Sequence, residues 1–324
     1  DQCQSGDSIN AGVPAIGALV PYTTNKPIHL LRGAVIENAV DAYLPGPAMA
    51  WSHRRTYDSH LVPPDEDYVE LEGLEGYRWF GNGQNPYLRL TDENDPSTSD
   101  VGLYVDASSR RDFEYHDTTS GITTYTPPAD YHATLTMQST ADSNDYDDDS
   151  DTGEYLDIYT LTNLETGDIL TFVGFDADVE TGFHGKLVER SSNRHADSVR
   201  YNYTTSGMVD NLTTSQGWAV DYDYEGGPES DRLSTIEVEN GDGTPIVIQK
   251  VEYTYYDDDY SHSADLGYDG VLVQVKVSRK LPGETGDNFS IVRYTQYRYY
   301  SFDIDGNPHQ LKMILDSDDI ERII

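Results

Sequence analysis

The chain has a single cysteine, Cys3, among its 324 residues, so no disulfide can form within it. It also lacks any run of 18 apolar residues, which argues against a membrane-spanning helix. Helical periodicity is almost absent. Its best example is residues 316–324, where three isoleucines follow Asp and Ser residues suited to helix capping. We therefore expect an almost wholly β protein with at most the start of a helix at 316–324.

Basic residues are scarce as well. The chain carries 58 acidic residues against 21 lysines and arginines, which gives a formal net charge of -37. A surface of this charge repels nucleic acids and anionic membranes, so we expect no nucleic-acid partner and no membrane insertion. It suits cation binding or a strongly solvated exterior.

Sequence motifs of common enzymes are missing. There is no Gly-x-Ser-x-Gly and no His-Glu-x-x-His, and the nine histidines are scattered. His53 and His195 are better interpreted as hydrogen-bonded structural residues than as catalysts. Carboxylate pairs suited to sugar hydrolysis occur by chance among 58 acidic residues, so spacing identifies none. We assign no catalytic residue and predict that the protein is not an enzyme.

Tyrosine, by contrast, is abundant, with 26 copies against 7 phenylalanines. A short alternating phrase ending in Tyr-x-Tyr occurs four times, at 199–203, 220–224, 251–255 and 295–299. Alternation places its large side chains on one face of a strand. After each phrase comes a turn-like gap and a second phrase with two aliphatic residues three apart. These pairs are Val209 and Leu212, Leu233 and Ile236, Leu272 and Val275, and Leu311 and Ile314.

This repetition predicts an array of antiparallel β-hairpins. A unit that cannot bury its own face needs neighbours, so the hairpins should join into one long twisted or spiralling sheet. We expect the four Tyr-x-Tyr strands to lie side by side in that sheet, with their tyrosines on a shared face.

The repeated phrase resembles the YD repeat of bacterial RHS proteins. Asp231-Arg232-Leu233-Ser-Thr-Ile236 is close to the Gly-Arg-Leu-x-x-Ile half of that repeat, although the leading glycine is replaced. Gly185-Lys186-Leu187, followed by Val199 to Tyr203, looks like one more unit. The resemblance covers residues 172–315.

Residues 33–60 resemble the segment that precedes the repeats in RHS proteins. They contain a Gly33-Ala-Val35 strand, then Asp41, a Leu-Pro-Gly turn, and an Arg-x-Tyr-x-Ser strand ending at Ser59. Judged on its residues alone, this segment is an ordinary hairpin with a Pro-Gly-Pro turn. The resemblance implies a non-enzymatic, structural part of a secreted or cell-surface bacterial protein that contributes to a β-shell or an extracellular assembly. Its partners would be the remainder of the same polypeptide or further copies of itself.

Two other functions remain open. In a secreted carbohydrate-binding or adhesive β-protein, Trp79, Trp218 and tyrosines would stack on the sugar rings of a surface polysaccharide. In an extracellular fibre subunit, open sheet edges would join chain to chain. The direction of the aromatic side chains discriminates between scaffold and sugar binding, because stacking on sugars needs an exposed strip of rings.

We expect five regions along the chain. They are an extended N-terminal arm (1–32), an RHS-like opening hairpin (33–60), a β-rich subdomain (61–171), a YD-type repeat sheet (172–315) and a helix start or continuation (316–324).

The acidic loop 142–154 of the subdomain is the one candidate metal site. Asp147, Asp149, Asp151 and Glu154 offer oxygen ligands two or three residues apart in a turn-prone segment, which hard cations such as calcium favour. A solvated loop is the alternative. We expect no other cofactor.

Overall fold

The chain folds almost entirely into antiparallel β-structure, as expected from the sequence. The computed structural model describes residues 36–44, 50–58, 72–73, 76–77, 79–81, 86–92, 98–106, 109–141, 155–176, 179, 181–204, 206–225, 232–241, 246–256, 270–281, 288–299 and 311–317. A short 3-10 helix covers Thr181–Phe183. Of the expected C-terminal helix, only residues 316 and 317 are described.

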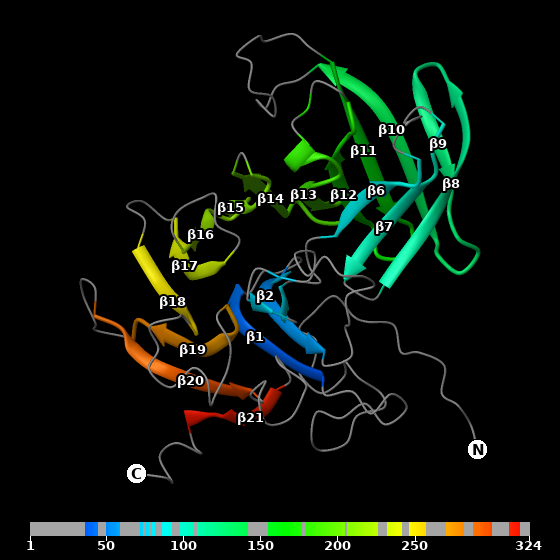
Figure 1. The fold of residues 1–324 in the computed structure, drawn as a ribbon. Coiled ribbons are helices and arrows are strands. Elements are labelled where there is room, and N and C mark those ends of the chain that lie inside the picture. Colours follow the sequence, from blue (N-terminus) through cyan, green and yellow to red (C-terminus); the bar gives the residue numbers. More distant parts are fainter. Residues whose placement is uncertain are drawn as a thin grey trace, which may run out of the picture.

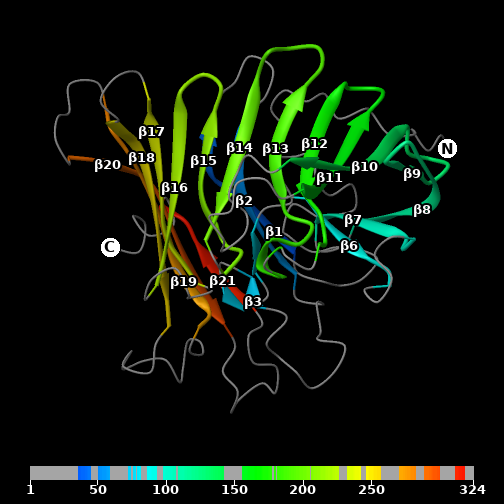
Figure 2. The same ribbon diagram turned by 90° about the horizontal axis from the view of Figure 1, so that it is seen from above.

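One 16-stranded sheet dominates the molecule (Figures 1 and 2). Each strand pairs with the next in the sequence, so the sheet is a continuous antiparallel meander from β6 to β21. It runs without interruption across residues 171 and 172, where the expected subdomain and repeat sheet adjoin. Its first eight strands are β6 (Tyr87–Leu90), β7 (Val101–Asp106), β8 (Ser109–Thr119), β9 (Ile122–Thr126), β10 (Ala133–Ala141), β11 (Tyr155–Asn163), β12 (Asp168–Val173) and β13 (Leu187–Ser192).

The remaining eight strands contain the repeated phrases. They are β14 (Ser198–Tyr203), β15 (Val209–Thr214), β16 (Trp218–Tyr224), β17 (Leu233–Asn240), β18 (Ile246–Tyr255), β19 (Leu272–Arg279), β20 (Ser290–Tyr299) and β21 (Leu311–Leu315). The four Tyr-x-Tyr strands are the even-numbered ones. They share one sheet, but they are not direct neighbours, because each hairpin's second strand separates one from the next.

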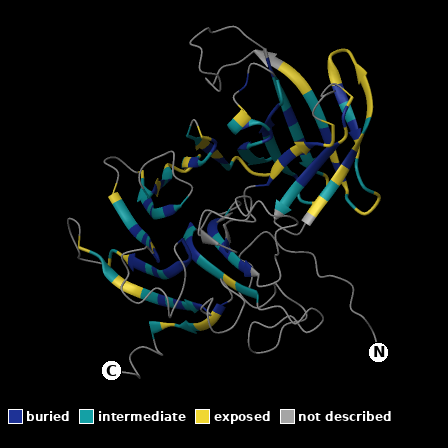
Figure 3. Ribbon diagram, in the orientation of Figure 1, coloured by how far each residue is buried: buried dark blue, intermediate teal, exposed yellow. Residues whose placement is uncertain are grey.

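The tyrosines of these strands do share a face. Both tyrosines of β16, β18 and β20 belong to the main hydrophobic core, as does Tyr201 of β14, and Tyr203 packs against it. The face is buried because polar residues alternate with aromatic ones, so one side of each strand is apolar. Figure 3 shows the result as buried segments along the inner side of the curved sheet.

A second, smaller sheet contains the N-terminal hairpin. Its strands are β1 (Ile36–Leu44), β2 (Trp51–Asp58) and β5 (Trp79–Gly81), in the order β1-β2-β5. A two-stranded ribbon pairs β3 (Glu72–Gly73) with β4 (Gly76–Tyr77). Figure 1 shows β1 and β2 beside strands β18–β21 of the long sheet.

The N-terminal end of the long sheet curls back on itself. The amide of Leu88 in β6 donates to the carbonyl of Gly185, and Tyr87 forms an isolated bridge with Lys186, just before β13. Gly185 has φ of +68°, and a Cβ there would lie 2.0 Å from the Leu88 carbonyl oxygen. Glycine is thus required both by the backbone conformation and by the close approach of β6.

Candidate functional site

The expected calcium ligands Asp147, Asp149, Asp151 and Glu154 lie outside the described residues, so the calcium site stays a prediction. Within the described ranges, no three His, Cys, Asp or Glu side chains are grouped so as to hold a metal ion. In the part of the chain that the structure describes, no helix has the length and apolarity needed to cross a bilayer.

The two histidines singled out in the sequence have different surroundings. His53 is 1% exposed. The centre of its ring lies 5.8 Å from the ring centre of Tyr222 and 6.2 Å from that of Tyr253. His195 is exposed in the turn between β13 and β14. They are not part of one site.

The most elaborate cluster of polar side chains is where the N-terminal hairpin meets the repeat strands. Its centre is Asp41, which occupies a β-bulge between Val40 and Ala42 in the pairing of β1 with β2. A bulge redirects the side chain of its extra residue. Here the Asp41 carboxylate has no exposed surface and points into the interface with the long sheet.

Two arginines hold this carboxylate from opposite sides of the interface. Arg55, on the neighbouring strand β2, donates from Nε to Oδ2 at 2.5 Å and from Nη2 to Oδ1 at 3.4 Å. Arg293, on β20, donates from Nη2 to Oδ1 at 2.5 Å and from Nη1 to the Val40 carbonyl at 2.8 Å. Tyr253 of β18 adds a bond to Oδ2 at 3.1 Å. The carboxylate therefore joins residues that lie more than 200 positions apart.

The charges of the cluster stabilise each other. Burial alone would raise the pKa of the Asp41 carboxyl, but Arg55 and Arg293 outweigh that effect and hold its pKa below the usual value. Burial would likewise lower the pKa of Arg55, but Asp41 beside it holds that pKa well above the usual value. Asp41 and Arg55 are thus both charged at neutral pH.

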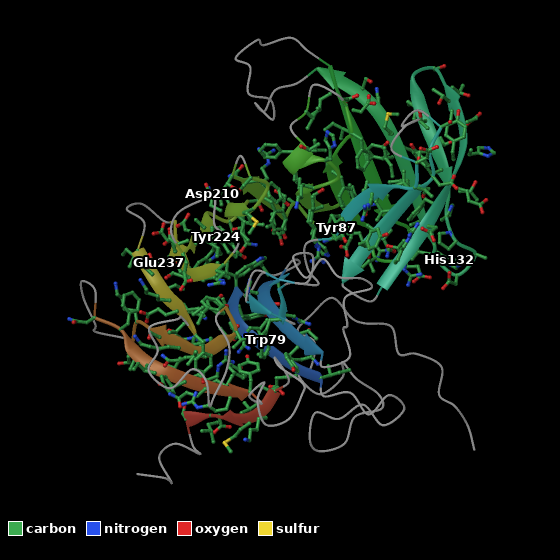
Figure 4. All side chains as sticks on the ribbon, viewed as in Figure 1. Trp79, Tyr87, His132, Asp210, Tyr224 and Glu237 are labelled. Carbon is green, nitrogen blue, oxygen red and sulfur yellow. The ribbon has the colours of Figure 1, made fainter. Side chains whose placement is uncertain are left out.

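Aromatic rings surround the Arg55 guanidinium. Its central carbon lies 4.6 Å from the ring centre of Trp79 and 5.0 Å from that of Tyr297, and Nη2 donates to the Tyr297 hydroxyl at 2.6 Å. Such cation–π contacts are strongest when desolvated. Figure 4 shows Trp79 inside the molecule, between the hairpin and the C-terminal strands.

Further polar bonds fix the hairpin along the sheet. Gln249 Nε2 donates to the Asp41 carbonyl at 2.8 Å, and Trp79 Nε1 donates to the Tyr299 hydroxyl at 2.9 Å. At the last strand, the Leu311 amide donates to the Tyr57 hydroxyl at 2.7 Å. The hairpin is therefore held at β18, β20 and β21.

A second recurring feature links neighbouring hairpins of the array. The second tyrosine of each Tyr-x-Tyr phrase follows a register shift and donates its hydroxyl hydrogen to a backbone carbonyl of the preceding hairpin. We call these bonds tyrosine staples. The four staples are Tyr203 to Leu187 (2.6 Å), Tyr224 to Val209 (2.7 Å), Tyr255 to Leu233 (2.6 Å) and Tyr299 to Leu272 (2.8 Å).

Sequence reasoning found some of these residues and missed others. Asp41, Arg55 and Tyr57 were recognised as parts of the opening segment, and the tyrosines as parts of the repeat. Arg293 and Gln249 were missed, because a polar residue next to a strand's apolar face looks solvent-facing in sequence. The only signal was that each lies four residues before a Tyr-x-Tyr tyrosine, Tyr297 or Tyr253.

Neither a scan against protein-family models nor a search of curated proteins gives a match for this chain.

Proposed function

We propose that this chain is a non-enzymatic structural part of a secreted or cell-surface RHS/YD-repeat protein, contributing to a β-shell or extracellular assembly. The observation that carries the proposal is the set of four tyrosine staples at equivalent positions. A hydrogen bond repeated at each of the four Tyr-x-Tyr strands favours the building of an extended sheet from like units.

The placement of the aromatic side chains favours a scaffold over sugar binding. Trp79 is fully buried, Trp218 packs against the core, and the repeat tyrosines face the interior. Among the described residues, Tyr87 is the one large aromatic residue that is exposed, at 43% of its surface. Its ring stacks on that of Tyr104, with 4.9 Å between the ring centres. A sugar platform needs several adjacent exposed rings, which the described surface does not offer.

The opposite face of the sheet suits an extracellular environment. Figure 4 places Asp210 and Glu237 there, on β15 and β17. Asp221 of β16 lies among such carboxylates. Its pKa is raised, mainly by partial burial and then by the negative charges of Glu239 and Asp210. In this reading, the acidic face keeps the assembly solvated.

Fractionation of the producing cells tests the proposal. An antibody raised against the purified chain should detect the protein in the medium or on the cell surface, in an assembly or a longer polypeptide. Recovery only as a free cytoplasmic chain of about the calculated 36.2 kDa would contradict it.

A further inference from the structure

Two tyrosine rings lie face to face on neighbouring strands at the start of the long sheet. Tyr87 of β6 stands directly opposite Tyr104 of β7 in the antiparallel register. Their ring centres are 4.9 Å apart and their planes differ by only 4°, so the rings are stacked. Side chains directly opposite each other on one face of a sheet stay in contact as long as the two strands remain paired.

The Tyr104 ring is held in position by its other neighbours on the same face. The central carbon of the Arg110 guanidinium, on β8, lies 5.4 Å from the ring centre, and Arg110 Nε donates to Asp112 Oδ1 at 2.6 Å. Gly102 leaves the space that both side chains use. A Cβ at that residue would lie 3.2 Å from Tyr104 Cε2 and 3.1 Å from Arg110 Nε. The ring is therefore kept between Arg110 on one side and Tyr87 on the other.

The pair is accessible to small oxidants. Tyr87 is 43% exposed and Tyr104 is half-buried. Partial burial first, and then the neighbouring Tyr104, raise the pKa of Tyr87, so its phenol is neutral at physiological pH and loses a proton when it loses an electron. Tyr125 and Tyr159 form a contrasting pair, because both are buried and their rings are tilted by 35° with 5.9 Å between the ring centres.

We propose that Tyr87 and Tyr104 form a covalent dityrosine cross-link when a haem peroxidase and hydrogen peroxide act on the protein. One electron and one proton leave each phenol, and one molecule of hydrogen peroxide takes up both electrons and both protons to become two molecules of water. The two phenoxyl radicals then join by a bond between one Cε carbon of each ring. The hydrogen on each of these carbons moves to the phenol oxygen of its own ring, which restores both hydroxyl groups.

The cross-link ties β6 covalently to β7 in a chain that cannot form an internal disulfide, because Cys3 is its single cysteine. It also secures the contact that the Leu88 amide makes with the Gly185 carbonyl, since Leu88 follows Tyr87 on β6. Like a disulfide, such a bond stabilises the fold mainly by restricting the unfolded chain. Amide exchange at 87–90 should therefore be slower after oxidation than before it.

Tryptic digestion locates the cross-link without ambiguity. Trypsin cleaves after arginine, so Tyr87 and Tyr104 are the sole tyrosines of peptides 79–89 and 90–110. The full 324-residue chain, treated at low concentration with a haem peroxidase and hydrogen peroxide, should yield these two peptides joined. Mass spectrometry should find them two hydrogen atoms lighter than the sum of the separate peptides, in a fraction with dityrosine fluorescence.

Two conservative variants test the assignment. Tyr87→Phe keeps a ring of the same shape but removes the phenol, so the joined peptides should disappear. Tyr125→Phe is the matched control and should leave their yield unchanged, because Tyr125 is buried and belongs to the contrasting pair. The proposal is overturned if the joined peptides are absent from the oxidised wild type, or are a minor product beside coupling between chains or at other tyrosines. Equal dityrosine fluorescence from wild type and Tyr87→Phe also overturns it.

This inference goes beyond the proposed function and does not depend on it. The oxidation is carried out on the purified chain, so its result is the same wherever the protein is located in or outside the cell. Failure of the cross-link would leave the proposed function standing, and a cytoplasmic location would leave the cross-link standing.

Discussion

Tyr255 illustrates why the second aromatic residue of each Tyr-x-Tyr phrase is a tyrosine and not a phenylalanine. Its ring belongs to the apolar core, and its hydroxyl donates a hydrogen bond of 2.6 Å to the carbonyl oxygen of Leu233. Phenylalanine would fill the same space but leave the carbonyl without a donor. The same requirement applies at all four staples, which account for four of the chain's 26 tyrosines.

Replacing Tyr255 by phenylalanine should lower the free energy of unfolding by about 1–3 kcal/mol, the cost of leaving a buried polar group unbonded. Chemical denaturation of purified variants measures it. Tyr115→Phe is the matched control, because the Tyr115 hydroxyl has only a long 3.4 Å contact with Thr118, and should change stability by less than about 0.5 kcal/mol. Equal effects of the two substitutions would argue against the staple.

Asp41 is the residue on which the hairpin interface depends most. Asp41→Asn keeps the shape of the side chain but leaves the charges of Arg55 and Arg293 uncompensated. We expect a loss of about 3–5 kcal/mol in unfolding free energy. Asp112→Asn, which breaks the exposed 2.6 Å pair with Arg110, should cost about 1 kcal/mol at most.

Acid titration of the same variant gives a further check. Because the pKa of Asp41 is lowered in the folded protein, its contribution is fully present above its unfolded value of about 4 and is lost as the pH falls through the lower folded value. The stability gap between wild type and Asp41→Asn should therefore shrink only in strong acid. A gap that closed near neutral pH would contradict the assignment.

At the scale of elements, the repeat strands were the most predictable part of the molecule. Alternation in Val251-Glu-Tyr253-Thr-Tyr255 determines the buried face of β18 without reference to any neighbour. The docking of the hairpin was not predictable. It depends on a bulge that turns Asp41 inward and on Arg293, which lies more than 250 residues away, and local patterns do not report such contacts.

The contact between β6 and Gly185, in which the Leu88 amide donates to the Gly185 carbonyl, was also not predictable from the sequence. Gly185→Ala places a Cβ 2.0 Å from the Leu88 carbonyl in a backbone conformation with positive φ, so it should release β6 and accelerate amide exchange at 87–90. Gly121→Ala is the control, because Gly121 also has positive φ, +79°, but has nothing within 4 Å of the added carbon. If both variants exchanged equally at β6, the close approach would not matter.

The acidic loop 142–154 gives an element-scale prediction that depends on sequence alone. Millimolar calcium should raise the melting temperature above its value in chelator, because a ligand that binds only the folded state stabilises it. The double variant Asp149→Asn, Asp151→Asn should lose the response. A wild-type melting temperature that is the same with calcium and with chelator would exclude the site.

At the scale of the whole molecule, the two edge strands of the long sheet, β6 and β21, make different contacts. The edge at β6 bends back and bonds to Gly185 and Lys186. Near the edge at β21, the N-terminal hairpin holds the Leu311 amide through Tyr57, while Ile314 stays half-buried. An edge strand with this geometry pairs readily with another strand. Within the described residues, the β6 edge is therefore bonded back onto the sheet, whereas β21 pairs with β20 alone.

Light scattering of the purified 324-residue chain over a wide concentration range tests this account most directly. A chain that contributes to an assembly should associate increasingly as its concentration rises, because further copies of itself are among its proposed partners. Ile314→Asn should reduce that association. A stable, soluble monomer at every concentration would contradict the proposal that this chain contributes to an assembly.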